Sequence, residues 1–263
     1  MNTIGFLGCG NMGSAIIKQL AKDPSYTLLC YDAIKEVAQK VAHENNIKSE
    51  SYDEVLKHST IIILAVKPQV LPSLYESLRK YPHIKFISIA AGVTLSTLST
   101  QLQTHNVVRF MPNMASSIGK SVTAITYDEV CDNMFADEAI KIGKSFGKTH
   151  ILDESLFASF IGISGSGIAM MFSLFHNMAQ GAVHSGLNYS SALSIIADTA
   201  MSAGALINES NEHPSALITK VCSPGGTTIE MMRALSDASF ESAVMDGVIE
   251  AAAKAQALDN NKQ

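Results

Sequence analysis

Charge is sparse in this sequence and is nowhere gathered into a basic run. Of the 263 residues only 16% are charged, and 19 Lys and Arg against 24 Asp and Glu give a formal net charge of −5. So little charge, together with 47% hydrophobic residues, excludes a disordered chain and indicates a folded globular protein. The missing basic run removes the electrostatic footprint that nucleic-acid binding needs, so we expect no nucleic-acid partner.

Cysteine is also scarce, and its spacing matches no metal or disulfide pattern. Cys9, Cys30, Cys131 and Cys222 form no CxxC pair and no closely spaced set with histidine. Zinc sites and disulfide frameworks both depend on such spacing. We therefore expect no bound metal and a reducing, cytoplasmic location.

Charge is missing altogether from residues 155–197. Glycines and polar residues, among them Ser164-Gly165-Ser166-Gly167, interrupt every run that could span a bilayer. We expect a buried or interface helix here and no membrane partner. The stretch is longer than one small helical domain can hide, so we also expect at least a dimer.

The spacing of apolar residues changes near residue 152. Before this point, short β-branched runs alternate with helical stretches, which predicts a mainly parallel, doubly wound α/β domain over 1–153. After it, long apolar stretches at helical spacing, such as 168–184 and 190–209, predict an all-α domain over 154–263. The expected strands are 3–7, 27–32, 61–66, 85–89, 106–111, 121–126 and 148–152.

A glycine-rich loop follows the first expected strand and opens an apolar helix over 14–20. Glycines let the backbone turn tightly and approach a pyrophosphate, and the start of a helix supplies free N–H groups. In this setting the pattern predicts dinucleotide binding rather than a plain glycine turn. The loop reads Gly8-Cys9-Gly10-Asn11-Met12-Gly13, and we place Gly8, Gly10, Asn11, Met12 and Gly13 at the cofactor.

Asp32 ends the second expected strand, about 20 residues beyond the loop, where an acidic residue accepts hydrogen bonds from the adenosine ribose. This position favours NAD. The 2′-phosphate of NADP would meet like charge there unless Lys35 or another cation compensates. The alternative is an exposed aspartate at a strand end without a ligand role.

Three further motifs end expected strands, at the edge where open α/β sheets bind ligands. The first brings a stiff turn and one cation, and the second brings small residues that leave room for a flat ring. Each motif is also compatible with an ordinary strand-to-helix connection that binds no ligand. The motifs are Ala65-Val66-Lys67-Pro68, Ser88-Ile89-Ala90-Ala91-Gly92 and Arg109-Phe110-Met111-Pro112-Asn113, and from them we add Ala65, Val66, Lys67, Pro68, Ala90, Ala91, Gly92 and Asn113 to the predicted cofactor site.

A second candidate anion site lies in the helical part. Ser223-Pro224-Gly225-Gly226-Thr227-Thr228 precedes an amphipathic helix over 229–235. We expect Ser223 to cap this helix, the glycines to expose N–H groups and the two threonine hydroxyls to donate hydrogen bonds. The alternative is a capped turn that binds nothing.

Taken in order along the chain, these motifs resemble those of the pyrroline-5-carboxylate reductase family. The resemblance covers essentially the whole chain and includes Gly-Ile-Ser-Gly-Ser-Gly at 162–167 and His213-Pro214. The motif at 223–228 is highly specific to that family. The resemblance implies NAD(P)H-dependent reduction of 1-pyrroline-5-carboxylate to L-proline, the last step of proline synthesis. It also implies a Rossmann-type domain over 1–153 and a helical dimerisation and substrate domain over 154–263, with dimers that sometimes assemble into rings.

The resemblance also assigns roles in the substrate site. Ser223, Gly226 and Thr227 would hold the substrate carboxylate, with Gly225 in the same loop. The catalytic residue would be Thr228, facing the ring nitrogen as a donor or relay. We expect His213 to orient a helix start before Pro214 rather than to shuttle protons.

Two positions depart from the family pattern. Ile168-Ala169-Met170 stands where members commonly have Pro-Ala-Tyr, so no tyrosine contact carries over. Asp32 stands where members usually have a neutral or basic residue, which brings a preference for NADPH into question.

Two other functions remain as alternatives. A 3-hydroxyacid dehydrogenase-like enzyme needs a lysine in the long helix, but Met171 stands four residues after Gly167, where its pattern would place that lysine. A non-catalytic dinucleotide-sensing regulatory protein would bind the cofactor but would not need the second anion site.

Overall fold

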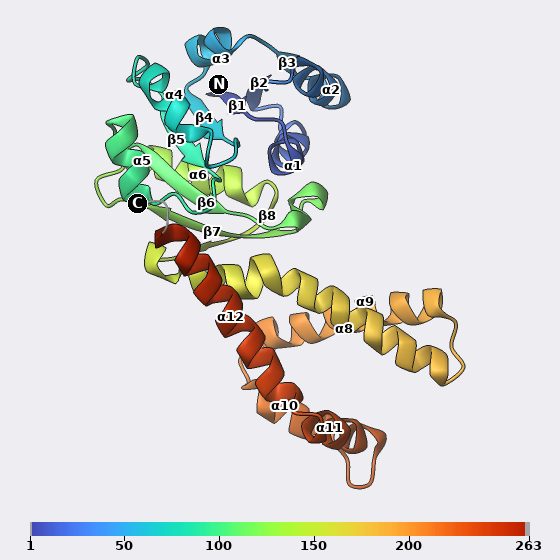
Figure 1. The fold of residues 1–263 in the computed structure, drawn as a ribbon. Coiled ribbons are helices and arrows are strands. Elements are labelled where there is room, and N and C mark those ends of the chain that lie inside the picture. The colour runs from blue at the N-terminus through green and yellow to red at the C-terminus, as the bar shows by residue number, and fades with distance from the viewer. Residues whose placement is uncertain (1, 261–263) are drawn as a thin grey trace. The chain divides into compact units, whose positions relative to one another are not determined.

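The structure is a computed structural model that describes residues 2–260 (Figure 1). Its contacts divide these residues into two compact units, one formed by 2–165 and 251–260 and the other by 166–250. The domain boundary expected after residue 153 falls within the first unit and stays a prediction.

The first unit is built on one eight-stranded sheet, in the order β3-β2-β1-β4-β5-β6-β7-β8. Neighbouring strands are parallel except β6 and β7, which are antiparallel. This confirms the mainly parallel, doubly wound α/β prediction. The strands are β1 (Asn2–Leu7), β2 (Tyr26–Tyr31), β3 (Lys48–Ser49), β4 (Ile61–Leu64), β5 (Lys85–Ser88), β6 (Val107–Met111), β7 (Ser121–Tyr127) and β8 (Gly147–Ile151).

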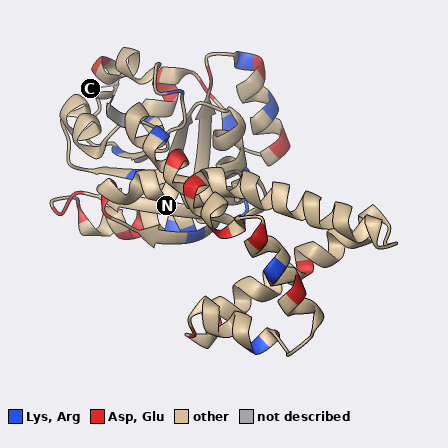
Figure 2. Ribbon diagram, turned by 60° about the horizontal axis from the view of Figure 1, so that its bottom comes forward, with Lys and Arg blue, Asp and Glu red and all other residues tan. Residues whose placement is uncertain are grey.

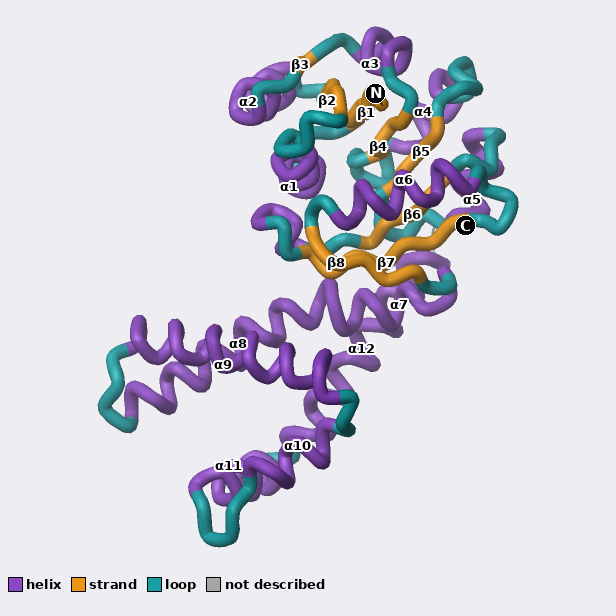
Figure 3. Tube along the Cα trace, turned by 180° about the vertical axis from the view of Figure 1, so that it is seen from behind, coloured by secondary structure: helices purple, strands orange, loops and turns teal. Residues whose placement is uncertain are grey.

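Helices cover both faces of this sheet (Figure 3). Alternate strand residues point to opposite faces, so Ile61 and Ile63 lie in one core while Ile62 and Leu64 lie in the other. The first core is closed by α1 (Asn11–Leu20), α2 (Lys35–Asn45) and α6 (Asn133–Lys144), and the second by α3 (Tyr52–His58), α4 (Leu71–Leu78) and α5 (Leu95–Leu102).

A segment of mixed helical type completes this unit. The 3₁₀ turn η2 (Glu154–Leu156), the helix α7 (Phe157–Phe160) and the π-helical turn η3 (Ile161–Ser166) follow one another without a break. Phe157 and Phe160 pack against Met111 of β6 and Ala124 of β7. A separate 3₁₀ turn, η1 (Met114–Ile118), follows β6.

Every element that the structure describes beyond residue 153 is helical, which confirms the all-α prediction for the second part. The helices are α8 (Gly167–His184), α9 (Tyr189–Ser210), α10 (Pro214–Val221), α11 (Thr227–Asp237) and α12 (Phe240–Asn260). Helices α8 and α9 lie side by side (Figure 1). They meet through buried Ala179, Ala192 and Ile196, and His176 Nδ1 lies 2.9 Å from the Tyr189 hydroxyl.

Much apolar surface of these helices is exposed in the single chain. Figure 2 shows long stretches of helix without charge. The stretches Glu154–His184 and Tyr189–Ser210 are long and apolar enough to cross a membrane by length and composition alone, which is weak support for a span. An apolar cavity of about 520 Å³ also lies between α8, α9 and Met231 of α11. Exposed apolar surface of this extent is typical of an interface, and a second protein chain suits it as the partner.

Candidate active site

The glycines of the loop after β1 are required for three different reasons. Gly8 has a left-handed backbone, with φ of 104°, and a Cβ there would lie 2.6 Å from the Ala65 carbonyl oxygen. A Cβ on Gly13 would collide with the carbonyl oxygen of Gly8. Gly10 has no atom within 4 Å of the place a Cβ would take, and it lines a cavity. Gly8 and Gly13 therefore shape the loop, whereas Gly10 leaves space open.

Helix α1 begins directly at this loop with an uncapped end. The helix starts at Asn11, earlier than the residue 14 expected from the sequence, and its N-cap is Gly10, which makes no side-chain hydrogen bond. The first N–H groups of a helix have no partner within it. With the positive end of the helix dipole, they make this loop suited to an anion such as a pyrophosphate.

A cavity of about 750 Å³ opens beside the loop, at the carboxyl ends of β1, β2 and β4. Ile34 and Val70 both line it and remain 60% and 41% exposed. A concave site lined mainly by apolar side chains with a few polar groups is typical of a small-molecule pocket. The lining residues are Leu7, Gly8, Gly10, Tyr31, Asp32, Ala33, Ile34, Tyr52, Ala65, Val66, Lys67, Val70, Ser73, Leu74 and Ser77.

Asp32 is fixed at the rim of this cavity by two backbone N–H groups. Its Oδ2 accepts a hydrogen bond from the N–H of Cys9 at 2.8 Å, and its Oδ1 accepts one from the N–H of Ile34 at 2.9 Å. Each carboxylate oxygen has a second lone pair available. The carboxylate can therefore hold the glycine-rich loop and still accept ribose hydroxyls.

Cys9 supplies a backbone contact here and no nucleophile. A hydrogen bond to the Cys30 thiol raises the pKa of the Cys9 thiol above its ordinary value, and burial raises it further. Its side chain is buried in the same core as Cys30. The thiol stays protonated at neutral pH.

The structure gathers only part of the predicted cofactor site around the cavity. Gly8, Gly10, Asp32, Ala65, Val66 and Lys67 line it, and Asn11, Met12 and Gly13 form the adjoining start of α1. Pro68 and the segment 90–92 lie outside the lining residues. Ala90 and Gly92 are buried, and Ala91 is exposed.

The Asn113 side chain is engaged inside the first unit. Its Oδ1 accepts hydrogen bonds from the N–H groups of Ala115 and Val122, at 3.2 and 3.4 Å. Its Nδ2 lies 3.3 Å from the Oγ of Ser164 in the π-helical turn. Asn113 thus ties the end of β6 to the turn at 161–166.

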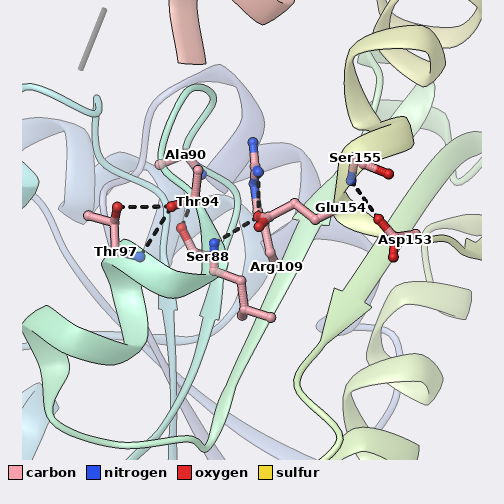
Figure 4. A network of polar contacts seen from close by, with 9 residues as sticks. Ser88, Ala90, Thr94, Thr97, Arg109, Asp153, Glu154 and Ser155 are labelled. Atoms are coloured by element: carbon pink, nitrogen blue, oxygen red, sulfur yellow. Dashed lines mark hydrogen bonds and ion pairs between the residues drawn. The ribbon is translucent and has the colours of Figure 1, made fainter. Parts of the chain in front are cut away.

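A buried ion pair joins the same strand to the start of the helical segment (Figure 4). Arg109 is fully buried, and its Nη1 donates to Glu154 Oε1 at 2.6 Å. The same oxygen accepts the N–H of Leu95 at 2.7 Å, and the guanidinium lies 4.9 Å from the ring centre of Phe157. Sequence reasoning treated Arg109 as part of a strand-end motif and missed this role. Its one signal was a charged residue inside the apolar strand Val107–Met111.

The second anion site has the expected glycines, but the predicted cap is wrong. Helix α11 begins at Thr227 with Gly226 as its N-cap and no side-chain cap. Ser223 lies too early to cap, and its carbonyl instead accepts the N–H of Gly226 at 3.0 Å to close a turn. Gly225 has φ of 65°, a conformation that suits glycine. The first N–H groups of α11 therefore remain available to an anion.

His213 caps α10 as expected. Its Nδ1 accepts the N–H of Ser215 at 3.2 Å, ahead of Pro214 in the first turn. Within residues 2–258, whose side chains the structure describes, no three His, Cys, Asp or Glu side chains are grouped as a metal ion requires.

The fold and the glycine-rich loop define a two-part Rossmann-type oxidoreductase with a helical second part. Family models agree: "NADP oxidoreductase coenzyme F420-dependent" matches residues 3–92, and "Pyrroline-5-carboxylate reductase dimerisation" matches residues 154–258.

Known proteins narrow this class to one family. Pyrroline-5-carboxylate reductase of Escherichia coli is 33% identical over 267 residues, covering 98% of both chains. The crystal structure of the Streptococcus pyogenes enzyme is 28% identical with a TM-score of 0.85, covering 97% of this chain and 98% of that one. The Plasmodium falciparum enzyme with NADP bound is 24% identical with a TM-score of 0.87, covering 98% of both chains. This chain belongs to the pyrroline-5-carboxylate reductase family.

Proposed function

We propose that this chain reduces 1-pyrroline-5-carboxylate to L-proline with NAD(P)H, as the last step of proline biosynthesis. The observation that carries the proposal is the presence of two uncapped, glycine-led helix starts, at α1 and at α11. A dinucleotide uses one such anion site at its pyrophosphate. The substrate carboxylate supplies the anion for the other.

The first unit supplies the cofactor site. The N–H groups at Asn11, Met12 and Gly13 hold the pyrophosphate, and Lys67 adds a positive charge at the end of β4. The backbone of Ala65 and Val66 lies directly against Gly8 and leaves no room for a side chain there. We place Pro68 and the segment 90–92 next to the nicotinamide half, where small residues leave room for a flat ring. Asn113 supports that half by fixing the turn at 161–166.

The loop before α11 supplies the substrate site. The N–H group at Thr227 and the hydroxyl of exposed Ser223 bind the carboxylate. Gly226 brings the backbone close to it while its own N–H closes the turn onto the Ser223 carbonyl, and Gly225 gives the loop its turn. When bound, the nicotinamide supplies a hydride to the imine carbon. The hydroxyl of Thr228, a half-buried residue, donates a hydrogen bond to the ring nitrogen or relays a proton to it. The iminium form of the substrate already carries this proton and has no lone pair on its nitrogen, so toward that form the hydroxyl oxygen accepts the N–H and orients the ring instead of acting as an acid.

The dimerisation match over residues 154–258 supports a homodimer, and we propose that dimers further assemble into rings. We place the enzyme in the cytoplasm, with a small-molecule substrate and neither nucleic acid nor membrane as a partner. The exposed apolar helices are then interface rather than membrane surface.

One assay tests the activity against both alternatives. Oxidation of NADH and of NADPH is followed separately by absorbance, first with 1-pyrroline-5-carboxylate and then with a 3-oxo acid. The proposal expects turnover with the imine and formation of proline. Turnover with the 3-oxo acid alone would identify a hydroxyacid dehydrogenase, and dinucleotide binding without turnover would identify a sensor.

A further inference from the structure

The rim of the dinucleotide cavity carries a fixed negative charge at the place where NAD and NADP differ. Asp32 directly follows β2 and lines the cavity. Its two hydrogen bonds, from the N–H groups of Cys9 and Ile34, hold the carboxylate in place. Because the Cys9 bond also positions the glycine-rich loop, the carboxylate cannot turn away from a 2′-phosphate without disturbing the pyrophosphate site.

The cation that lines this cavity follows a strand on the other side of β1 from Asp32. Of the described residues that line the cavity, Lys67 alone carries a positive charge. Tyr31 and Leu64 pair with Leu7 from opposite sides, so β2 and β4 flank β1. Two strand spacings separate the ends of these strands by roughly 10 Å. Lys67 is therefore placed for the pyrophosphate rather than for a 2′-phosphate beside Asp32.

Two carboxylates lie at the start of α2 and offset the positive end of that helix. The helix has no side-chain cap, but Asp32 accepts the N–H of its N-cap, Ile34, and Glu36 lies in its first turn. Lys35 and Glu36 are both exposed and neither lines the cavity, so Asp32 is the charged residue of this segment that a 2′-phosphate in the cavity would meet.

We infer that this chain selects NADH over NADPH and that Asp32 is the residue that discriminates between them. The inference rests on the proposed function for its dinucleotide site. Asp32 accepts the ribose 2′-hydroxyl of NADH and repels the 2′-phosphate of NADPH.

The test is equilibrium binding without substrate, followed by the fluorescence of the reduced nicotinamide. Wild-type protein should bind NADH at least about 10-fold more tightly than NADPH, the scale of one hydrogen bond to a charged group. Asp32→Asn keeps an acceptor and removes the charge, so it should shift the affinity ratio toward NADPH by about 10-fold or more. The wild-type discrimination should also shrink as salt is raised, because charge repulsion is screened.

Two variants serve as controls. Lys67→Gln should weaken both dinucleotides alike and leave their ratio unchanged. Glu44→Gln removes one negative charge near the far end of α2 and should change neither affinity. Because Asp32→Asn also affects the loop, Asp32→Ser and the melting temperatures of both variants are measured beside it.

Equal binding of the two dinucleotides by the wild type, or tighter binding of NADPH, would overturn the inference. So would an unchanged ratio in a folded Asp32 variant. Failure of the proposed function looks different: NADH binds with the expected preference, but 1-pyrroline-5-carboxylate is not reduced with either dinucleotide.

Discussion

At the scale of single residues, a substitution at Gly10 should weaken dinucleotide binding without impairing folding. Gly10→Ala adds a methyl group where no atom lies within 4 Å, so the protein should fold with a nearly unchanged melting temperature. The added methyl group occupies open space where Gly10 lines the cavity that we propose for the dinucleotide. We expect NADH affinity to fall at least about 10-fold, on the order of 1.4 kcal/mol. The measurement is a dinucleotide titration beside a thermal melt.

Gly13→Ala is the matched control for this change. Its methyl group meets the carbonyl oxygen of Gly8, so overpacking should cost about 1 to 3 kcal/mol of stability as well as affinity. If Gly10→Ala bound NADH as well as the wild type, the loop would not face the cofactor.

Thr228 and Ser223 should differ in what their loss does to the reaction. Thr228→Ala should lower kcat/KM for the imine by about 10- to 1,000-fold, because in the proposed site the hydroxyl faces the nitrogen whose bonding changes. Ser223→Ala should chiefly raise KM, because the carboxylate that we propose it anchors keeps its charge during hydride transfer. Steady-state kinetics of both variants measure the contrast.

The structure sharpens this comparison. Ser223 does not cap α11, so Ser223→Ala should leave the helix and the melting temperature intact. Wild-type imine reduction by Thr228→Ala, or loss of NADH binding in either folded variant, would show that the substrate site is misplaced.

Sequence spacing located Asp32 and the glycines because their positions follow from one strand, one loop and one helix. The contacts of Arg109 were beyond such reasoning, since Glu154 and Leu95 approach it only after distant segments have packed. Asn113 shows the same limit. The sequence placed it at a strand end, but its side chain faces Ser164, which is far away in the chain.

At the scale of elements, the strands and long helices followed from periodicity, and the irregular elements did not. β3 has only two residues and pairs at the sheet edge with β2, so it leaves no pattern of alternation. The π-helical turn at Ile161–Ser166 depends on packing against β6 and β7 and has no signal of its own. The start of α11 was misjudged because a serine early in a glycine-rich loop resembles an N-cap, while the chain turns once more before the helix begins.

The buried ion pair should hold the segment beginning at Glu154 onto the sheet. Arg109→Met keeps most of the side-chain volume but leaves the Glu154 carboxylate without its cation, and we expect a loss of about 3 to 5 kcal/mol of stability. The double variant Arg109→Met, Glu154→Gln removes both charges. It should be less destabilised than the sum of the single variants. Urea unfolding of the four proteins measures this coupling, and additive losses would contradict it.

At the scale of the whole molecule, the exposed apolar helices require a second chain. Met201 and Ile207 of α9 are 67% and 53% exposed, and both lie within the region that matches the dimerisation family. Leaving this much apolar surface in water is unfavourable. We expect light scattering to give at least twice the 28.1 kDa of one chain at micromolar concentration.

Met201→Asp should shift the protein toward the monomer because it buries a charge in the interface. Met134→Asp, on the 82% exposed Met134 of α6, is the matched control and should leave the oligomer intact. A stable wild-type monomer, or equal effects of the two substitutions, would rule out an interface on α9.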